Sequence, residues 1–103
     1  MTRRNRRQLR NRDFRNVGDT MTSSAVNMVE LVEHLAKVLV NAPDEVEAEA
    51  FEEDGQTVIE LFVAEDDLGR IIGRQGRMAR SLRTIVSAAA LRTRRRYQLE
   101  IVE

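Results

Sequence analysis

LGRIIGRQGRMARSLR, residues 68–83, contains the break that decides the fold. Gly73 and Gly76 stand three residues apart inside a run with helical spacing, and a glycine within a helix costs about 1 kcal/mol relative to alanine. Two glycines so close together predict that one helix stops, a short G-x-x-G loop follows and a second helix begins. Five arginines surround this predicted loop, namely Arg70, Arg74, Arg77, Arg80 and Arg83.

A G-x-x-G loop between two helices is suited to binding a phosphate group. Because neither glycine has a Cβ, a phosphate can approach the backbone N–H groups and the positive end of the second helix. Arg74 and Gln75 are expected to project toward the same space, and arginine can hold a phosphate bidentately. Ile71 and Ile72 precede the loop, so we expect one to pack inward and the other to support a stacked base.

The segments on either side of the loop predict an α+β domain. The spacing of apolar residues indicates helices over 24–40, 68–72 and 77–92 and strands over 46–53, 56–64 and 97–103. Asp54-Gly55 predicts an antiparallel hairpin, and the last strand, which returns after a crossover, is expected to be parallel to its neighbour. Asp66 or Asp67 is expected to cap the helix at 68.

This order, α-β-β-α-α-β, predicts a three-stranded mixed sheet with three helices on one face. The other face of the sheet carries many of the glutamates, so it is expected to meet water or a partner.

The net charge of zero conceals three strongly charged segments. Residues 1–20 hold seven arginines and two aspartates, a net of +5, whereas residues 21–67 carry a net of −12 and residues 68–103 a net of +7. Such polarity is typical of a protein that presents a basic region to an anion, although the segments could instead neutralise each other across the fold. The arginines at 92–96 are open to both interpretations, as a phosphate contact or as partners of Glu47, Glu49 and Glu60.

Composition predicts a disordered basic tail at residues 1–20 and a single domain at 21–103. Because Met21 is a second plausible start, the tail is an upstream extension, a translation-start ambiguity, or a basic arm with nonspecific affinity for polyanions. The sequence has no cysteine, no apolar run near the ~20 residues of a membrane span and no secretory signal. We therefore expect a cytoplasmic protein.

Residues that carry out catalysis are scarce in this sequence. With one histidine, no cysteine and no Ser–His–Asp set, the chain offers neither a nucleophile nor a set of metal ligands. The glycines at 69–76 lack the spacing and the Gly-Lys-Ser/Thr of a nucleotide-binding P-loop. We expect no enzymatic activity, no metal and no cofactor.

IIGRQG, residues 71–76, resembles the signature of the K-homology (KH) domain, a module that binds RNA and single-stranded nucleic acid. With VELVEHLAKVLVNAPDEVE, the run from 63 to 86 and the C-terminal LEIVE, the chain is similar over about residues 26–103 to the small bacterial single-KH proteins of the KhpA family. This resemblance implies a type II KH fold. Joined to the neighbouring arginines, it gives the expected RNA-binding residues Arg70, Ile72, Gly73, Arg74, Gln75, Gly76, Arg77 and Arg80.

The family resemblance also implies a function. It implies RNA binding without strong sequence preference, work as an RNA chaperone or post-transcriptional regulator, and pairing with a larger KH-and-R3H protein of the KhpB (Jag) type. It further implies a link to cell-wall homeostasis and cell elongation. One position departs from the signature, because Ala79 stands where KH domains usually have a branched aliphatic residue, which predicts a shallower groove or packing and weaker base selectivity.

Two alternative functions remain open from the residues themselves. The small core, the acidic sheet and the alanines at 88–90 are compatible with a protein-interaction subunit that forms a homodimer or a heteromer. Single-stranded DNA is the other alternative, because no residue visibly reads a 2′-hydroxyl group.

Overall fold

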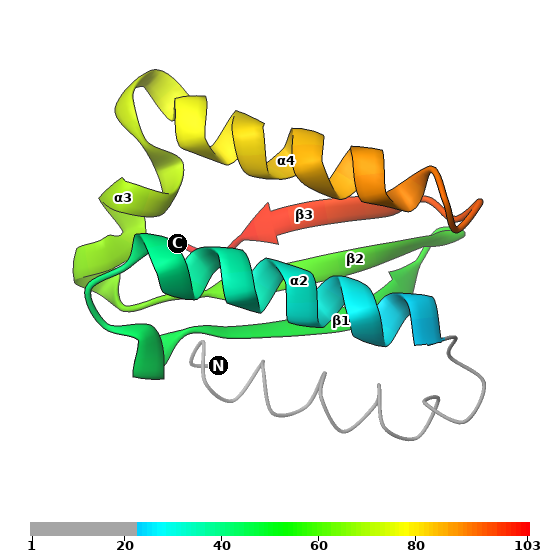
Figure 1. Cartoon of the computed structure of the whole chain (residues 1–103), viewed down its shortest axis with the longest axis horizontal. Coiled ribbons are helices and arrows are strands. Elements are labelled where there is room, and N and C mark those ends of the chain that lie inside the picture. The colour runs from blue at the N-terminus through cyan, green and yellow to red at the C-terminus, as the bar shows by residue number, and fades with distance from the viewer. Residues whose placement is uncertain (1–22) are drawn as a thin grey trace.

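The computed structural model describes residues 23–103, so the predicted tail at 1–20 lies outside the described residues (Figure 1). The described helices and strands, in chain order, are α2 (Ser23–Leu39), β1 (Glu47–Glu53), β2 (Gln56–Phe62), α3 (Leu68–Ile72), α4 (Arg77–Ala90) and β3 (Tyr97–Ile101). The predicted α-β-β-α-α-β order is confirmed, and every observed boundary lies within two residues of the expected one.

β2 is the central strand of a three-stranded sheet with the order β1-β2-β3. It pairs antiparallel with β1 and parallel with β3, so the predicted mixed sheet is confirmed. The hairpin turns at Asp54-Gly55, where both residues have positive φ angles of 52° and 79°. This is the backbone conformation that Asp-Gly favours in a two-residue hairpin turn.

The helices and the sheet form two layers (Figure 1). α2 and α4 pack directly on one face of the sheet, and α3 packs against both helices at one end of the domain. The apolar stripes predicted for these helices supply the core, because burying them against the sheet removes them from water. Core side chains from all layers include Met28, Val32, Ile59, Leu61, Ile71, Leu82, Val86 and Leu99.

Asp67 ties the end of α2 to the start of α3. Its buried carboxylate accepts hydrogen bonds from the backbone N–H groups of Asn41 and Ala42, at 3.1 and 3.0 Å. Asp67 occupies the N-cap position of α3, as predicted, but the prediction that its side chain caps the helix is wrong, because no side-chain cap bond is made there. The carboxylate instead satisfies two amides that lose helical partners where Pro43 ends the helical path.

The second face of the sheet is more covered than the sequence predicts. Glu60 in the central strand is 0% exposed, and it stands between Glu49 of β1 and Glu100 of β3. Of the two alternatives expected for this face, water or a partner, water is excluded for Glu60.

Candidate nucleic-acid interface

The first half of the G-x-x-G loop needs glycine for two separate reasons. Gly73 ends α3 with φ 77° and ψ 171°, while its N–H still donates to the carbonyl of Gly69 at 2.8 Å. A Cβ at this position would lie 2.6 Å from the Cβ of Met78, at the start of α4. The backbone conformation and the close approach of the two helices therefore both exclude a side chain.

The second half of the loop is a single 3-10 turn, Arg74–Gly76. Gln75 and Gly76 have positive φ angles of 57° and 73°, and a Cβ on Gly76 would meet nothing within 4 Å. The Gly76 N–H donates to the carbonyl of Gly73 at 3.1 Å, and the Arg77 N–H donates to that of Arg74. These two amides are therefore used within the loop itself.

The start of α4 carries the positive end of the helix dipole. Gly76 occupies the N-cap position, no side-chain hydrogen bond caps the helix, and its first turn contains no acidic residue. Such a helix end favours an anion, because its partial positive charge has no negative group beside it.

Exposed arginines surround this helix end. Arg74, Arg77 and Arg80 are all exposed, and no ion pair to a described residue is recorded for any of them. Arg70 is also exposed, but its Nε lies 3.6 Å from Oδ1 of Asp67, so its charge is partly compensated. Ile71 is fully buried and Ile72 is half-buried, which places one isoleucine in the core and the other at the rim of the loop.

An open hollow continues from this corner along the outer side of α4. Its volume is about 520 Å³, and its lining joins two basic side chains to hydroxyl groups and one apolar side chain, from Arg77, Arg80, Ser81, Thr84 and Ile85. A charged and partly apolar surface of this kind can contact both the phosphates and the bases of a nucleic-acid strand.

A second groove lies between α4 and the edge strand β3, and the sequence analysis missed it. It has a volume of about 370 Å³ and is lined by Arg83, Val86, Tyr97 and Leu99 among others. The Arg83 Nε donates to the carbonyl of Leu99 at 3.4 Å, so the guanidinium bridges the two walls. The position of the last strand in the sequence could have predicted this groove. A strand that follows a crossover helix becomes an edge of the sheet beside that helix.

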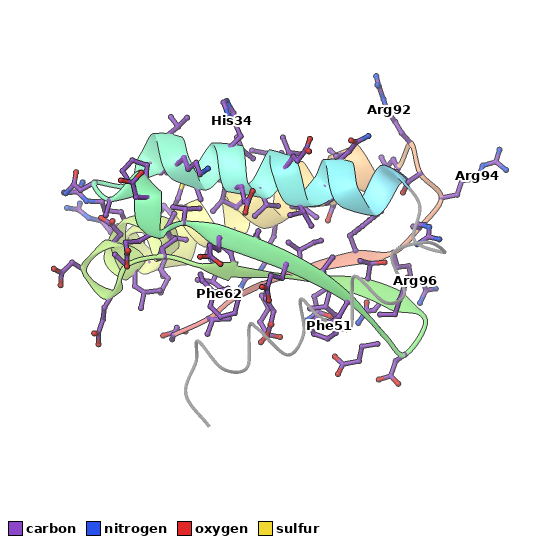
Figure 2. The ribbon with its side chains drawn as sticks, turned by 90° about the horizontal axis from the view of Figure 1, so that it is seen from below. His34, Phe51, Phe62, Arg92, Arg94 and Arg96 are labelled. Carbon is purple, nitrogen blue, oxygen red and sulfur yellow. The ribbon has the colours of Figure 1, made fainter. Side chains whose placement is uncertain are left out.

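The basic cluster at 92–96 lies at the other end of α4. Arg95 Nη1 is 3.3 Å from Oε1 of Glu52, and Figure 2 shows Arg92 and Arg94 pointing away from the body of the domain. Of the two interpretations that the sequence left open, ion pairing thus applies to Arg95, but its recorded partner is Glu52 rather than Glu47, Glu49 or Glu60.

Within residues 23–103, no three His, Cys, Asp or Glu side chains are grouped so that they could hold a metal ion. None of the helices in that part of the chain is long and apolar enough to cross a membrane.

The family model described as "KhpA/KhpB, KH domain" matches residues 29–101. The chain belongs to the KhpA/KhpB KH-domain family. The RNA-binding protein KhpA of Borreliella burgdorferi is 47% identical to it over 77 residues, which are 75% of this chain and 94% of that protein. The RNA-binding protein KhpA of Caldanaerobacter subterraneus is 47% identical over 75 residues, which are 73% of this chain and 100% of that protein.

The type II KH fold implied by the sequence is therefore confirmed. A solved structure of Era from Aquifex aeolicus matches this KH domain with a TM-score of 0.53 at 20% identity, over 75% of this chain and 30% of that one. At that identity the likeness supports the fold alone. The departure at Ala79 falls in the core, since this residue is 5% exposed, and its small size acts on the packing beneath α4.

Proposed function

We propose that this protein binds single-stranded RNA and that the loop between α3 and α4 holds the RNA backbone. The observation that carries the proposal is the uncapped start of α4, ringed by the exposed side chains of Arg74, Arg77 and Arg80. The similar KhpA proteins are named RNA-binding proteins, which supports the same conclusion. The proposed RNA-binding residues are those expected from the sequence, namely Arg70, Ile72, Gly73, Arg74, Gln75, Gly76, Arg77 and Arg80.

In this mechanism, the phosphates and the bases of the RNA strand contact two different surfaces of the protein. A phosphate sits at the start of α4, where the helix dipole and the guanidinium groups attract it. The bases then follow the groove between α4 and β3, where the half-buried Tyr97 ring offers apolar surface. Burial raises the pKa of the Tyr97 phenol above its usual value of 10.0, and its aromatic ring is suited to contact with a base.

Because the phosphates and the bases contact separate surfaces, we predict that RNA binding has weak sequence preference. The phosphate contacts carry no base information, and most of the attraction comes from charge. Arg83 already donates to the Leu99 carbonyl, so this backbone acceptor is partly used within the protein. We further propose that residues 21–103 act as the RNA-binding unit in the cytoplasm, as an RNA chaperone or post-transcriptional regulator. We also propose that the protein acts with a KhpB (Jag)-type partner and that it is linked to cell-wall homeostasis and cell elongation.

The double variant Arg74→Asp/Gln75→Asp tests the proposal. Fluorescence anisotropy with a labelled single-stranded RNA oligomer should show an affinity loss of at least about 100-fold, because two charge-assisted contacts are replaced by repulsion. Circular dichroism should be unchanged, since both side chains are exposed. Competition with a DNA oligomer of the same sequence tests the alternative ligand, and tighter binding of the DNA would assign the site to DNA.

The matched control is His34→Asp/Lys37→Asp on the exposed side of α2. It changes the charge by about the same amount but lies on another element, and both side chains are exposed. Binding should stay within about threefold of the wild type, because salt screens exposed charges that do not contact the RNA. Wild-type affinity in the loop variant, or an equal loss in both variants, would contradict the proposed site.

A protein-pairing function is the second candidate, and exposed apolar side chains favour it. Leu91 is 83% exposed and Ile85 is 40% exposed, both on the outer side of α4 or just beyond it. Size-exclusion chromatography with light scattering should then show a mass that rises with concentration, and Ile85→Glu/Leu91→Glu should restore the monomer. A constant monomer mass would remove self-pairing.

A further inference from the structure

The sheet face turned away from α2 and α4 carries a row of three carboxylates. Glu49 pairs with Glu60 in the β1–β2 ladder, and Glu60 pairs with Glu100 in the β2–β3 ladder. Residues paired directly across strands project from the same face, about 5 Å apart. Three like charges abreast repel one another, so a cationic group lying over this row would stabilise the sheet.

Apolar side chains flank the carboxylate row on both sides. Phe51 pairs with Val58 on one side of it, and Phe62 stands opposite Glu47 on the other. Figure 2 shows Phe51 and Phe62 on the side of the sheet opposite α2. We call this surface the acidic face, and it comprises Glu47, Glu49, Phe51, Val58, Glu60, Phe62, Gln98 and Glu100.

The centre of the acidic face is buried although α2 and α4 contact the other side of the sheet. Glu60 is 0% exposed, and Val58 and Phe62 are each 1% exposed. Neither Val58 nor Phe62 belongs to the core cluster between the sheet and the helices. A segment that combines arginines with a few apolar residues matches this surface, because guanidinium groups pair with carboxylates and their alkyl stems cover apolar area.

Residues 1–20 have this chemistry. They contain seven arginines against two aspartates, with Leu9 and Phe14 among them. They also lie within reach, because α2 begins at Ser23 at the end of the sheet where β1 ends (Figure 1). A seven-residue strand such as β1 is about 23 Å long, and twenty residues can span more than twice that distance.

We propose that residues 1–20 dock on the acidic face of the same molecule, with their arginines over Glu49, Glu60 and Glu100. The +5 net charge of residues 1–20 then offsets part of the −12 net charge of residues 21–67 through a contact within one chain. In the docked state these arginines are unavailable to a polyanion. Nucleic-acid binding is then left to Arg74, Arg77 and Arg80 around the start of α4, which lie outside the acidic face.

The chain has no cysteine, so a single introduced one carries a spin label at a defined place. In ¹⁵N-labelled full-length protein, a nitroxide at Gln8→Cys should at least halve the amide signals of Phe51, Val58 and Gln98. The amide signals of Arg80 and Ser81 on α4 should keep their intensity. Equal intensity loss on the sheet and on α4, or none on the sheet, would overturn the proposal.

Two sets of substitutions test the charge pairing. Glu49→Gln/Glu60→Gln/Glu100→Gln should abolish the signal loss on the sheet, whereas the matched exposed set Glu30→Gln/Glu45→Gln/Glu65→Gln should preserve it. The converse variant leaves the sheet residues unchanged and lowers the net charge of residues 1–20 from +5 to +1, with Arg6→Gln, Arg7→Gln, Arg10→Gln and Arg12→Gln. Persistence of the signal loss in that variant would overturn the proposal.

A mixed sample identifies the source of the docked segment. Spin-labelled protein without ¹⁵N is combined with an equal amount of ¹⁵N-labelled protein without the spin label. Unchanged sheet signals in this mixture support docking within one molecule. Signal loss in the mixture of about half that in protein carrying both the spin label and ¹⁵N would assign the acidic face to a second copy and overturn the proposal.

Discussion

At its N-terminal end α4 begins among exposed arginines, whereas at its C-terminal end a second group of arginines is built into a turn. Arg74, Arg77 and Arg80 surround the positive end of the helix dipole, where a cation is unfavourable. Beyond Ala90, the Thr93 hydroxyl donates to the Ala90 carbonyl and accepts from the Arg95 N–H. Cations there lie beside the negative end of the helix, and Arg95 is also paired with Glu52.

The comparison separates two uses of the same residue type. The arginines after α4 are placed where the fold itself benefits from positive charge. The arginines before α4 are placed where the fold is slightly weakened by it, which is typical of a binding site that gains its counter-charge from a ligand. We therefore expect that equal substitutions before and after α4 have unequal effects on RNA binding and opposite effects on the free energy of unfolding.

Charge reversal should give the largest difference between the two ends. Arg77→Glu/Arg80→Glu should weaken binding of single-stranded RNA by at least about 100-fold, because two attractive contacts become repulsive. Arg92→Glu/Arg94→Glu, the matched change at the C-terminal end, should weaken it by less than about threefold at 0.15 M salt. Filter binding or anisotropy measures both affinities, and equal losses at the two ends would break the comparison.

Substituting single glycines should have a smaller and more local effect on RNA binding than charge reversal. Gly55 and Gly76 both have positive φ and open space where a Cβ would stand, so each change to alanine should cost about 1 kcal/mol of unfolding free energy. Only Gly76→Ala should also weaken RNA binding, by about tenfold, because its methyl group projects at the start of α4. Urea unfolding and anisotropy on both variants measure the two effects, and equal affinities would show that a phosphate does not approach Gly76.

The elements that sequence reasoning found are those whose signals are local. Gly73 and Gly76 predict the loop because positive φ and a missing Cβ are properties of the residues themselves. The hairpin at Asp54-Gly55 and the periodic helices follow from equally local rules. Family resemblance then assigned the loop to a KH domain, which short-range spacing alone would have left ambiguous.

The features that sequence reasoning missed depend on residues far apart in the chain. Asp67 serves amides 25 and 26 positions away, so nothing near it distinguishes it from an ordinary helix cap. The groove beside Arg83 exists only because β3 returns next to α4, and Arg95 meets Glu52 across 43 positions. Loop amides also pair within the loop, a detail set by backbone angles that composition does not reveal.

Salt dependence tests the comparison without reversing any charge. Arg74→Gln/Arg80→Gln should reduce the slope of log affinity against log salt concentration by about 1.4, because each phosphate contact on a single strand contributes about 0.7. Arg92→Gln/Arg94→Gln should leave the slope unchanged. A smaller slope in the second variant would place the strand along the whole length of α4, including its C-terminal end.

The smallest expected effects are on stability, and they should have opposite signs. Arg77→Ala should raise the free energy of unfolding by about 0.5 kcal/mol, because it removes a cation from the positive end of α4 and introduces a strong helix former. Arg95→Ala should lower it by up to about 1 kcal/mol, since the Arg95–Glu52 pair is only partly shielded from water. Urea unfolding followed by circular dichroism measures both values in the absence of RNA. Destabilisation by both changes would mean that Arg77 stabilises the fold, and the distinction between the two ends of α4 would then have to rest on RNA binding alone.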